Sequence, residues 1–249
     1  MVAFNISIGP GWTIGPGFAI GPGSASAGVG AWNFNGTNDL QILDYSPSTY
    51  TGNTTFEMWI RPTGTSTSPV WWLPNSYVSP TNYKKLQWYL AGPTLTAQNI
   101  PFGGGASAFT PISTTVNLNA WNYVCFAVVN GVAILYVNGV RIGSSTAANY
   151  TYRLDSWFVG YDTQPNPVEF FTGQLTNIRL SNADIYNLAA LPATMPVPTG
   201  QLTVQGTTLI LYTMADPNAN ISNETDSTGN AFTSANSPPT WVNSTPGPY

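Results

Sequence analysis

Two Asn-Gly pairs within one apolar stretch limit the fold of this chain more than any other feature of its sequence. The pairs Asn130-Gly131 and Asn138-Gly139 divide "WNYVCFAVVNGVAILYVNGVRIG" into three runs rich in β-branched residues. Asn and Gly both accept the positive φ values of a type I′ turn, which joins neighbouring antiparallel strands. The stretch from Tyr123 to Ile142 is therefore predicted to be an antiparallel meander.

Most of the remaining chain also consists of short apolar runs separated by turn residues. In "TTFEMWIRP", Phe56, Met58 and Ile60 fall on one face and the residues between them on the other, which predicts a half-buried strand. In "AWNFNGTNDLQIL", the pair Asn35-Gly36 is predicted to reverse a strand. Further strands are predicted in "SWFVGYD", "FFTGQLTNIRLSN" and "TTLILYTMA", and only "NADIYNLAAL" favours a short helical turn. Strands of this number and length predict an all-β sandwich or jelly roll.

The composition excludes several classes of function. Charged residues make up 6% of the 249 residues, and the six Lys and Arg are too few for the basic surface that binds nucleic acid. The absence of His excludes Ser-His-Asp and Cys-His catalysis and the usual zinc sites. No stretch approaches about 18 apolar residues, and no basic segment precedes an apolar N-terminal core, so neither a membrane span nor a signal peptide is predicted. The lone Cys125 lies in "YVCFAVV" and is predicted to pack as a small hydrophobe.

Four segments, in order and in spacing, resemble laminin-G-like domains of the concanavalin A-like lectin/glucanase superfamily. They lie within residues 31–182 and read "FNGTNDLQI", "TFEMWIRP", "AWNYVCFAVVNGVAILYVNGVRIG" and "FFTGQLTNIRLSN". Where many relatives have Trp-His-His-Val, this chain has Trp121-Asn122-Tyr123-Val124. The resemblance implies a concanavalin A-like, laminin-G-like antiparallel β-sandwich of the jelly-roll type.

The C-terminal part extends the resemblance to laminin-G-like proteins of marine phages, especially cyanophages. In ordinary relatives a strand followed by Asp-Ser-x-Gly-Asn opens the domain, whereas here "LILYTMA" and "DSTGN" come last. The order is that of a circular permutation. Because a lone strand at Thr207–Ala215 would have an unpaired edge unless it joined the preceding sheet, residues 24–249, with a permuted segment at 183–249, are predicted to form one sandwich.

The superfamily includes glycoside hydrolases, whose acids stand on one strand face in a Glu-x-Asp-x-Glu pattern. This chain has no such run, and Glu57 stands alone in the strand that looks equivalent. A retaining mechanism needs two carboxyl groups about 5 Å apart. Glu57 is therefore predicted to pair across the sheet with Arg61 or Arg179, and the protein is predicted not to be an enzyme.

The resemblance also implies a calcium ion, because many laminin-G-like domains hold one at the sandwich rim. Calcium binds six to eight oxygen ligands, which usually include several carboxylates. The acidic residues in or beside predicted loops are Asp39, Asp44, Asp155, Asp162 and Glu169, but no two of them are spaced as a ligand pair. The candidate ligands among them are Asp39, Asp44 and Asp162. No other cofactor is predicted.

Glycan binding is the third property that the fold suggests, and the stretch "PVWWLPNSYVSPTNYKKLQWYLAG" is its predicted location. Adjacent strand residues point to opposite faces, so one of Trp71 and Trp72 faces outward if both are extended. The predicted glycan-binding residues are Trp71, Trp72, Asn75, Tyr77, Asn82 and Tyr83. The alternative is that these aromatic side chains cap the core or fill a subunit interface.

The N-terminal residues 1–23 carry the sequence Ile-Gly-Pro-Gly three times at a spacing of six residues. Each Gly-Pro-Gly favours a type II turn, and the period of six excludes a collagen helix. The large apolar residues of this arm cannot build a core of their own; they are Ile8, Trp12, Ile14, Phe18 and Ile20. The arm is predicted to dock on another subunit, with docking on its own sandwich or a linker role as alternatives.

The resemblance to marine-phage proteins implies a phage structural protein, and the apolar arm on a weakly charged sandwich is consistent with either a capsid decoration protein or a tail-fibre component. Its arm would attach to other virion proteins or to symmetry mates, and its sandwich would face outward from the virion surface after synthesis in the host cytoplasm. The alternative is a lectin-like module that recognises glycans of the host surface. An endoglycanase is the least favoured function, because the carboxylates are missing.

Overall fold

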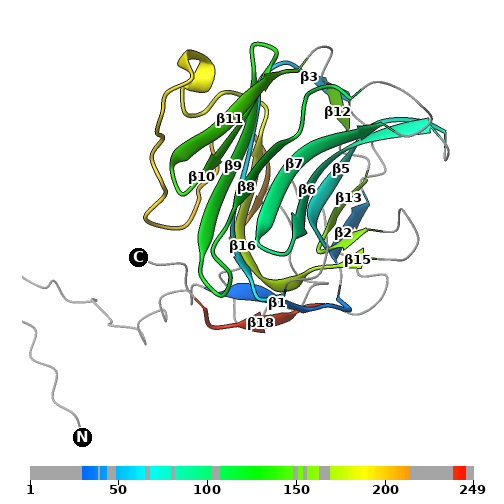
Figure 1. Ribbon diagram of the computed structural model, residues 1–249, viewed down its shortest axis with the longest axis vertical. Coiled ribbons are helices and arrows are strands. Elements are labelled where there is room, and N and C mark those ends of the chain that lie inside the picture. The colour runs from blue at the N-terminus through cyan, green and yellow to red at the C-terminus, as the bar shows by residue number, and fades with distance from the viewer. Residues whose placement is uncertain are drawn as a thin grey trace, which may run out of the picture.

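The computed structural model describes residues 30–38, 40–43, 49–64, 68–79, 82–101, 107–147, 151–153, 156–162, 169–213 and 238–244. Within these residues the chain forms two large antiparallel sheets that face each other, as Figure 1 shows. The predicted antiparallel β-sandwich is therefore confirmed. The N-terminal arm and its five apolar residues lie outside the described residues, as does the predicted boundary at residue 24.

One sheet has eight strands, in the order β11-β10-β9-β4-β16-β1-β18, with β17 pairing along another part of β16. Its strands are β1 (Ala31–Asn35), β4 (Thr54–Pro62), β9 (Asn122–Val129), β10 (Val132–Val137), β11 (Val140–Thr146), β16 (Thr172–Ser181), β17 (Thr208–Tyr212) and β18 (Thr240–Val242). The strand predicted at Thr207–Ala215 does join the preceding sheet, as β17.

The other sheet has six strands, in the order β2-β13-β5-β6-β7-β8. They are β2 (Leu40–Leu43), β5 (Ser68–Ser79), β6 (Asn82–Ala91), β7 (Thr94–Pro101), β8 (Ile112–Thr115) and β13 (Ser156–Val159). Two small sheets pair β3 (Thr49–Thr51) with β12 (Thr151–Arg153) and β14 (Tyr161–Asp162) with β15 (Glu169–Phe170). The predicted short helical turn is the 3₁₀ helix η1 (Leu188–Ala190).

The predicted meander is confirmed as β9, β10 and β11. Both of its turns have positive φ at the two central positions, 51° and 75° at Asn130-Gly131 and 50° and 78° at Asn138-Gly139. These are the values that type I′ turns require, which is why Asn and Gly occupy them.

The reversal predicted at Asn35-Gly36 is wrong as a hairpin, because β1 and β2 belong to different sheets. The Asn35 side chain accepts hydrogen bonds from the Thr37 backbone N–H (3.0 Å) and hydroxyl (2.8 Å), and Gly36 N–H donates to the Phe171 carbonyl at 3.2 Å. Local bonds of this kind compete with strand pairing. The Asn-Gly pair therefore makes a corner that takes the chain from one sheet to the other.

The main core lies between the two large sheets and is rich in aromatic rings. Phe56 of β4 packs against Trp88 of β6 with ring centroids 4.5 Å apart, and Phe109 packs against Phe126 of β9 at 5.4 Å. All four side chains are at most 3% exposed. Contacts between rings from opposite sheets stabilise the sandwich beyond their buried area alone.

The prediction that β4 is half-buried is wrong, because both of its faces are covered. Residues 182–207, here called the strap, run across the face of the eight-stranded sheet that points away from the main core, along the left of Figure 1. There Leu188 and Met195 of the strap pack with Trp59, Tyr123 and Cys125 in a second apolar cluster. The alternating pattern of β4 separates two buried environments, one of which contains polar groups. The Cys125 prediction is confirmed, since this thiol is buried.

Backbone and side-chain hydrogen bonds fix the strap to the sheet at several points. Met195 N–H donates to the Gly139 carbonyl (2.8 Å), and Arg141 N–H donates to the Ala193 carbonyl (2.9 Å). The Tyr136 hydroxyl donates to the Pro192 carbonyl at 2.8 Å. The strap is therefore an integral layer of the fold.

Candidate functional site

Glu57 of β4, the strand carboxylate, is fully buried beneath the strap in a closed hydrogen-bond network. Arg179 of β16 lies opposite it, and its Nε and Nη2 contact Glu57 Oε1 at 2.7 and 2.6 Å. Glu57 Oε2 accepts hydrogen bonds from the hydroxyls of Tyr123 and Tyr186, the latter at 2.8 Å. The predicted pairing with Arg179 is confirmed. Arg61, the alternative partner, instead donates to the Asn119 carbonyl and the Gln174 side chain.

A bulge in β16 places Arg179 on the same face as Glu57. Between the pairs Thr176–Trp59 and Arg179–Glu57, β16 has one residue more than β4. The extra residue allows Asn177 to adopt φ of 51°, a value that Asn tolerates better than most residues. The Asn177 side chain accepts a hydrogen bond from Leu202 N–H of the strap at 3.1 Å, so the bulge also anchors the strap.

The electrostatics of this network favour neutral tyrosine hydroxyls and a charged arginine. Burial raises the pKa of the Tyr123 hydroxyl well above its usual range, and the neighbouring Cys125 and Glu57 raise it further. Burial likewise raises the pKa of Tyr186. For Arg179, burial lowers the pKa, but the Glu57 carboxylate outweighs this effect and the pKa is raised. Arg179 also donates to the Thr203 carbonyl of the strap at 2.9 Å. Both oxygens of Glu57 are therefore occupied by protein groups.

The predicted calcium ligands are not tested by the described residues. Asp39 and Asp44 lie outside them, and Asp162 lies in β14, where the strand register places it opposite Glu169 of β15. Among the residues that the structure describes, no group of three or more His, Cys, Asp or Glu could hold a metal ion. The calcium site stays a prediction.

The six predicted glycan-binding residues all lie on one hairpin, β5–β6. Trp71, Trp72, Asn75 and Tyr77 belong to β5, and Asn82 and Tyr83 belong to β6. The register places Tyr77 opposite Tyr83 and Trp71 opposite Trp88, whose ring is in the core. These pairings bring the positions together in one sheet; binding by their side chains stays a prediction.

From the β6 strand of this hairpin, a row of residues runs across β7 to β8 on the face of the six-stranded sheet that points away from the core. Tyr89 of β6 lies opposite Thr96 of β7, which lies opposite Ser113 of β8. Tyr89 and Thr96 are partly exposed and Ser113 is exposed, and the two hydroxyl oxygens of Thr96 and Ser113 are 2.9 Å apart. The row combines an aromatic ring with hydroxyl groups and carries no charge.

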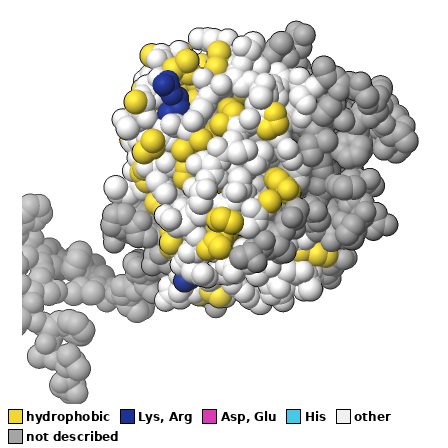
Figure 2. Space-filling model, in the orientation of Figure 1, with side chains coloured by type: hydrophobic (Ala, Val, Ile, Leu, Met, Phe, Trp, Pro, Cys, Tyr) yellow, Lys and Arg dark blue, Asp and Glu magenta, His cyan; other side chains and the backbone are white. Residues whose placement is uncertain are grey.

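Charged side chains are also rare on the face of the molecule that Figure 2 shows. On its described part, hydrophobic side chains are scattered, and Lys or Arg atoms occupy only small spots near the left margin. Among the described residues, no helix is long and apolar enough to span a membrane.

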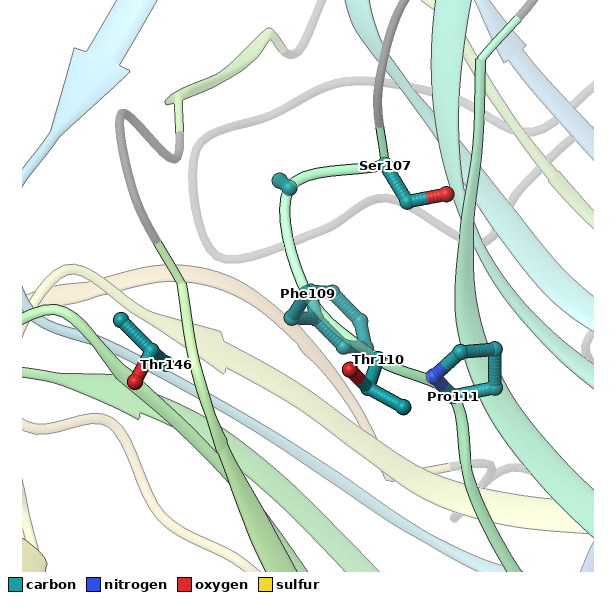
Figure 3. Close-up of a pocket in the computed structure, with 6 residues that line it drawn as sticks. Ser107, Phe109, Thr110, Pro111 and Thr146 are labelled. Carbon is teal, nitrogen blue, oxygen red and sulfur yellow. The ribbon is translucent and has the colours of Figure 1, made fainter.

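A pocket of about 350 Å³ opens where the segment before β8 meets the end of β11. Its lining residues are Ser107, Ala108, Phe109, Thr110, Pro111 and Thr146. Figure 3 shows Thr146 across the opening from the 107–111 segment. Its described lining residues carry hydroxyl groups and no charge.

Glu57, its arginine partner and the hairpin residues could be predicted from the sequence, whereas the strap residues, the pocket and the outward row could not. Tyr186 and Thr203 contact the network from the strap, a segment with no periodic pattern of its own. The pocket has no sequence signal, because Ser and Thr are common throughout this chain. For Tyr89 and Ser113, only strand alternation could have placed them on the outward face.

Comparisons with known proteins agree with this architecture. A family model described as the concanavalin A-like lectin/glucanases superfamily matches residues 34–187. A candidate carbohydrate-binding protein from Bacteroides ovatus superposes with a TM-score of 0.60 at 14% identity, over 86% of this chain and 59% of that one. The CBM40 of a Ruminococcus gnavus IT-sialidase, bound to α2,3-sialyllactose, superposes with a TM-score of 0.50 at 11% identity, over 62% of this chain and 91% of that one. A search of curated proteins finds no match.

The sandwich, the order of its strands and the family match over residues 34–187 lead to one conclusion: the chain belongs to the concanavalin A-like lectin/glucanase superfamily.

Proposed function

We propose that this protein is a non-catalytic carbohydrate-binding sandwich. The observation that supports it is the uncharged row Tyr89–Thr96–Ser113 on the outward face of the six-stranded sheet, which extends from the hairpin that carries the predicted glycan-binding residues. Sugar rings pack their C–H groups on aromatic faces, and a few hydroxyl or amide groups fix their orientation. The eight-stranded sheet offers no comparable face, because the strap covers much of it.

The state of Glu57 supports the non-catalytic part of the proposal. A glycosidase acid must exchange a proton with its substrate, and its partner carboxylate must stand about 5–9.5 Å away. Glu57 is 0% exposed and is held by Arg179, Tyr123 and Tyr186. Two solved structures with a similar fold support the carbohydrate-binding part. The Bacteroides ovatus protein is a candidate carbohydrate-binding protein, and the CBM40 was solved with a bound sugar.

Binding to a panel of immobilised glycans tests the proposal. We expect the folded wild-type chain to bind at least one glycan, and we expect Tyr89→Ala and the double variant Tyr77→Ala/Tyr83→Ala each to weaken that binding about tenfold, because an aromatic contact is lost. Val204→Ala, at an exposed strap position on the other sheet, is the matched control and should bind as the wild type does. A folded wild-type protein that binds no glycan above background would overturn the proposal.

A virion role is the second candidate, and the Ile-Gly-Pro-Gly repeat favours it. In this proposal the protein is a phage capsid decoration or tail-fibre subunit at the virion surface. The arm docks on other virion proteins or on symmetry mates, and the sandwich is displayed outward. Many copies on one particle would compensate for weak single contacts. The two roles are compatible, because display on a virion is a natural setting for a module that recognises host glycans.

Light scattering coupled to size-exclusion chromatography tests the arm directly. If the arm mediates self-assembly, the full chain will have the mass of an oligomer, and a chain that begins at Ser24 will be a folded monomer. Monomers of equal thermal stability in both cases would exclude self-assembly through the arm. An unchanged mass with a less stable shortened chain would instead mean that the arm packs on its own sandwich.

A further inference from the structure

We infer that the pocket formed by residues 107–111 and Thr146 binds a single uncharged sugar unit. This inference rests on the proposed carbohydrate-binding function and adds a second, separate site to it. The pocket adjoins β8, an outer strand of the same six-stranded sheet, and contains none of the residues predicted from the sequence.

The segment that forms the pocket is held in place by the protein itself. Ala108 N–H donates to the side-chain oxygen of the buried Asn99 at 2.9 Å, and Thr110 N–H donates to the Ser145 hydroxyl at 2.9 Å. Between them, the Phe109 side chain is only 3% exposed and packs against Phe126. Anchoring at three consecutive residues fixes the shape of the wall before any ligand arrives, which lowers the entropic cost of binding.

The same anchoring leaves the pocket hydroxyls available. Ser107, Thr110 and Thr146 are all exposed, and within the described part of the chain their hydroxyl groups make no hydrogen bond. A hydroxyl group donates one hydrogen bond and accepts others. These three groups are therefore suited to a ligand that presents donors and acceptors side by side, as the hydroxyls of a sugar do.

The charge and size of the pocket limit the classes of ligand that it can bind. None of its described lining residues is Lys, Arg, Asp or Glu, so a carboxylate or phosphate would find no counter-charge on them, and a wholly apolar ligand would leave the hydroxyls without partners. Ala108 and Pro111 supply a small apolar surface for the C–H groups of a ring. The hollow of about 350 Å³ has room for one sugar unit.

Titration of the full-length protein with methyl glycosides tests the inference, with binding followed by saturation-transfer NMR. The panel contains the methyl glycosides of glucose, galactose, mannose and N-acetylglucosamine, together with glucuronic and galacturonic acids as charged counterparts. The pocket variant is Ser107→Ala/Thr110→Val/Thr146→Val, which removes the three hydroxyls with little change of shape. The control is Thr199→Val/Thr207→Val, at two exposed strap positions.

We expect the wild type to bind a neutral glycoside and the pocket variant to bind it about tenfold more weakly, because the pocket variant loses several hydrogen bonds to the sugar. The control keeps these hydrogen bonds and should bind as the wild type does. The charged counterparts should bind no tighter than the neutral sugars. If Tyr89→Ala abolishes binding while the folded pocket variant keeps it, the pocket inference is wrong and the proposed function stands. If the folded wild type binds neither the glycosides nor the immobilised glycans, both fail.

Discussion

Replacing Arg179 by methionine will lower the free energy of unfolding by about 3–5 kcal/mol. The substitution removes the only cation in contact with Glu57 among the described residues and leaves a fully buried carboxylate without its counter-charge. Breaking one side of a buried ion pair is costly because the remaining charge stays desolvated. Urea denaturation followed by tryptophan fluorescence measures the loss.

The double variant Glu57→Leu/Arg179→Met distinguishes the cost of an unpaired buried charge from the cost of altered packing. Replacing both partners by apolar side chains of similar size is often neutral or stabilising, so this variant should recover at least half of the loss. The hydroxyls of Tyr123 and Tyr186 still lose an acceptor, which keeps recovery incomplete. A single-variant loss below about 1 kcal/mol, the value typical of exposed pairs, would mean that water reaches the network.

Alkaline pH will destabilise this protein more steeply than its few charges suggest. Burial raises the pKa of both Tyr123 and Cys125 well above their usual values. In the unfolded chain these groups titrate at about 10 and 8.5. Above those values the unfolded state releases protons that the folded state keeps, so the free energy of unfolding falls as pH rises. Each group contributes a slope of up to about 1.4 kcal/mol per pH unit.

Urea titrations at pH values from 7 to 11 test this expectation. The contribution of the two groups should be fully present at pH 7–8 and decline progressively above about pH 9, with the thiol titrating first. Cys125→Ala should delay the decline to about pH 10, and Tyr123→Phe should reduce its slope at higher pH. A free energy of unfolding that stays constant to pH 11 in the wild type would contradict the burial of these groups.

The parts of the fold that could be predicted from the sequence are those set by local chemistry. The Asn-Gly pairs determined the meander because positive φ at two consecutive residues is a requirement of the turn itself. The hairpin predicted at Asn35-Gly36 was wrong because Thr37 and Asn38 make local hydrogen bonds that turn the chain out of the sheet. One of them runs from Asn35 N–H to the side-chain oxygen of Asn38 at 2.9 Å. An Asn-Gly pair specifies a change of direction, and its surroundings decide which strand follows.

The remaining features depend on contacts between distant segments. The alternation in β4 correctly predicted two different faces. Nothing in the sequence of β4 indicates that the strap, more than a hundred residues later, covers the face that points away from the main core. The pairing of Glu57 with an arginine, Arg61 or Arg179, could be predicted because unpaired charges are rarely buried and few cations exist in this chain, but the choice of Arg179 depends on the bulge in β16. The pocket could not, since its shape depends on bonds from Asn99 and Ser145 to a segment without pattern.

The position of β1 has a consequence for how this chain reaches its native state. Trp32 lies opposite Leu175 of β16 on one side and Trp241 of β18 on the other, so the sheet joins the earliest and latest of its strands. Contacts of such long sequence separation form only after large loops have closed. The entropy of loop closure is lost before the contact energy is gained, which makes folding slow. During synthesis, β1 must wait for most of the chain to leave the ribosome before either of its neighbours exists. The meander from β9 to β11, whose internal pairings β9–β10 and β10–β11 are local, is the natural place for folding to begin.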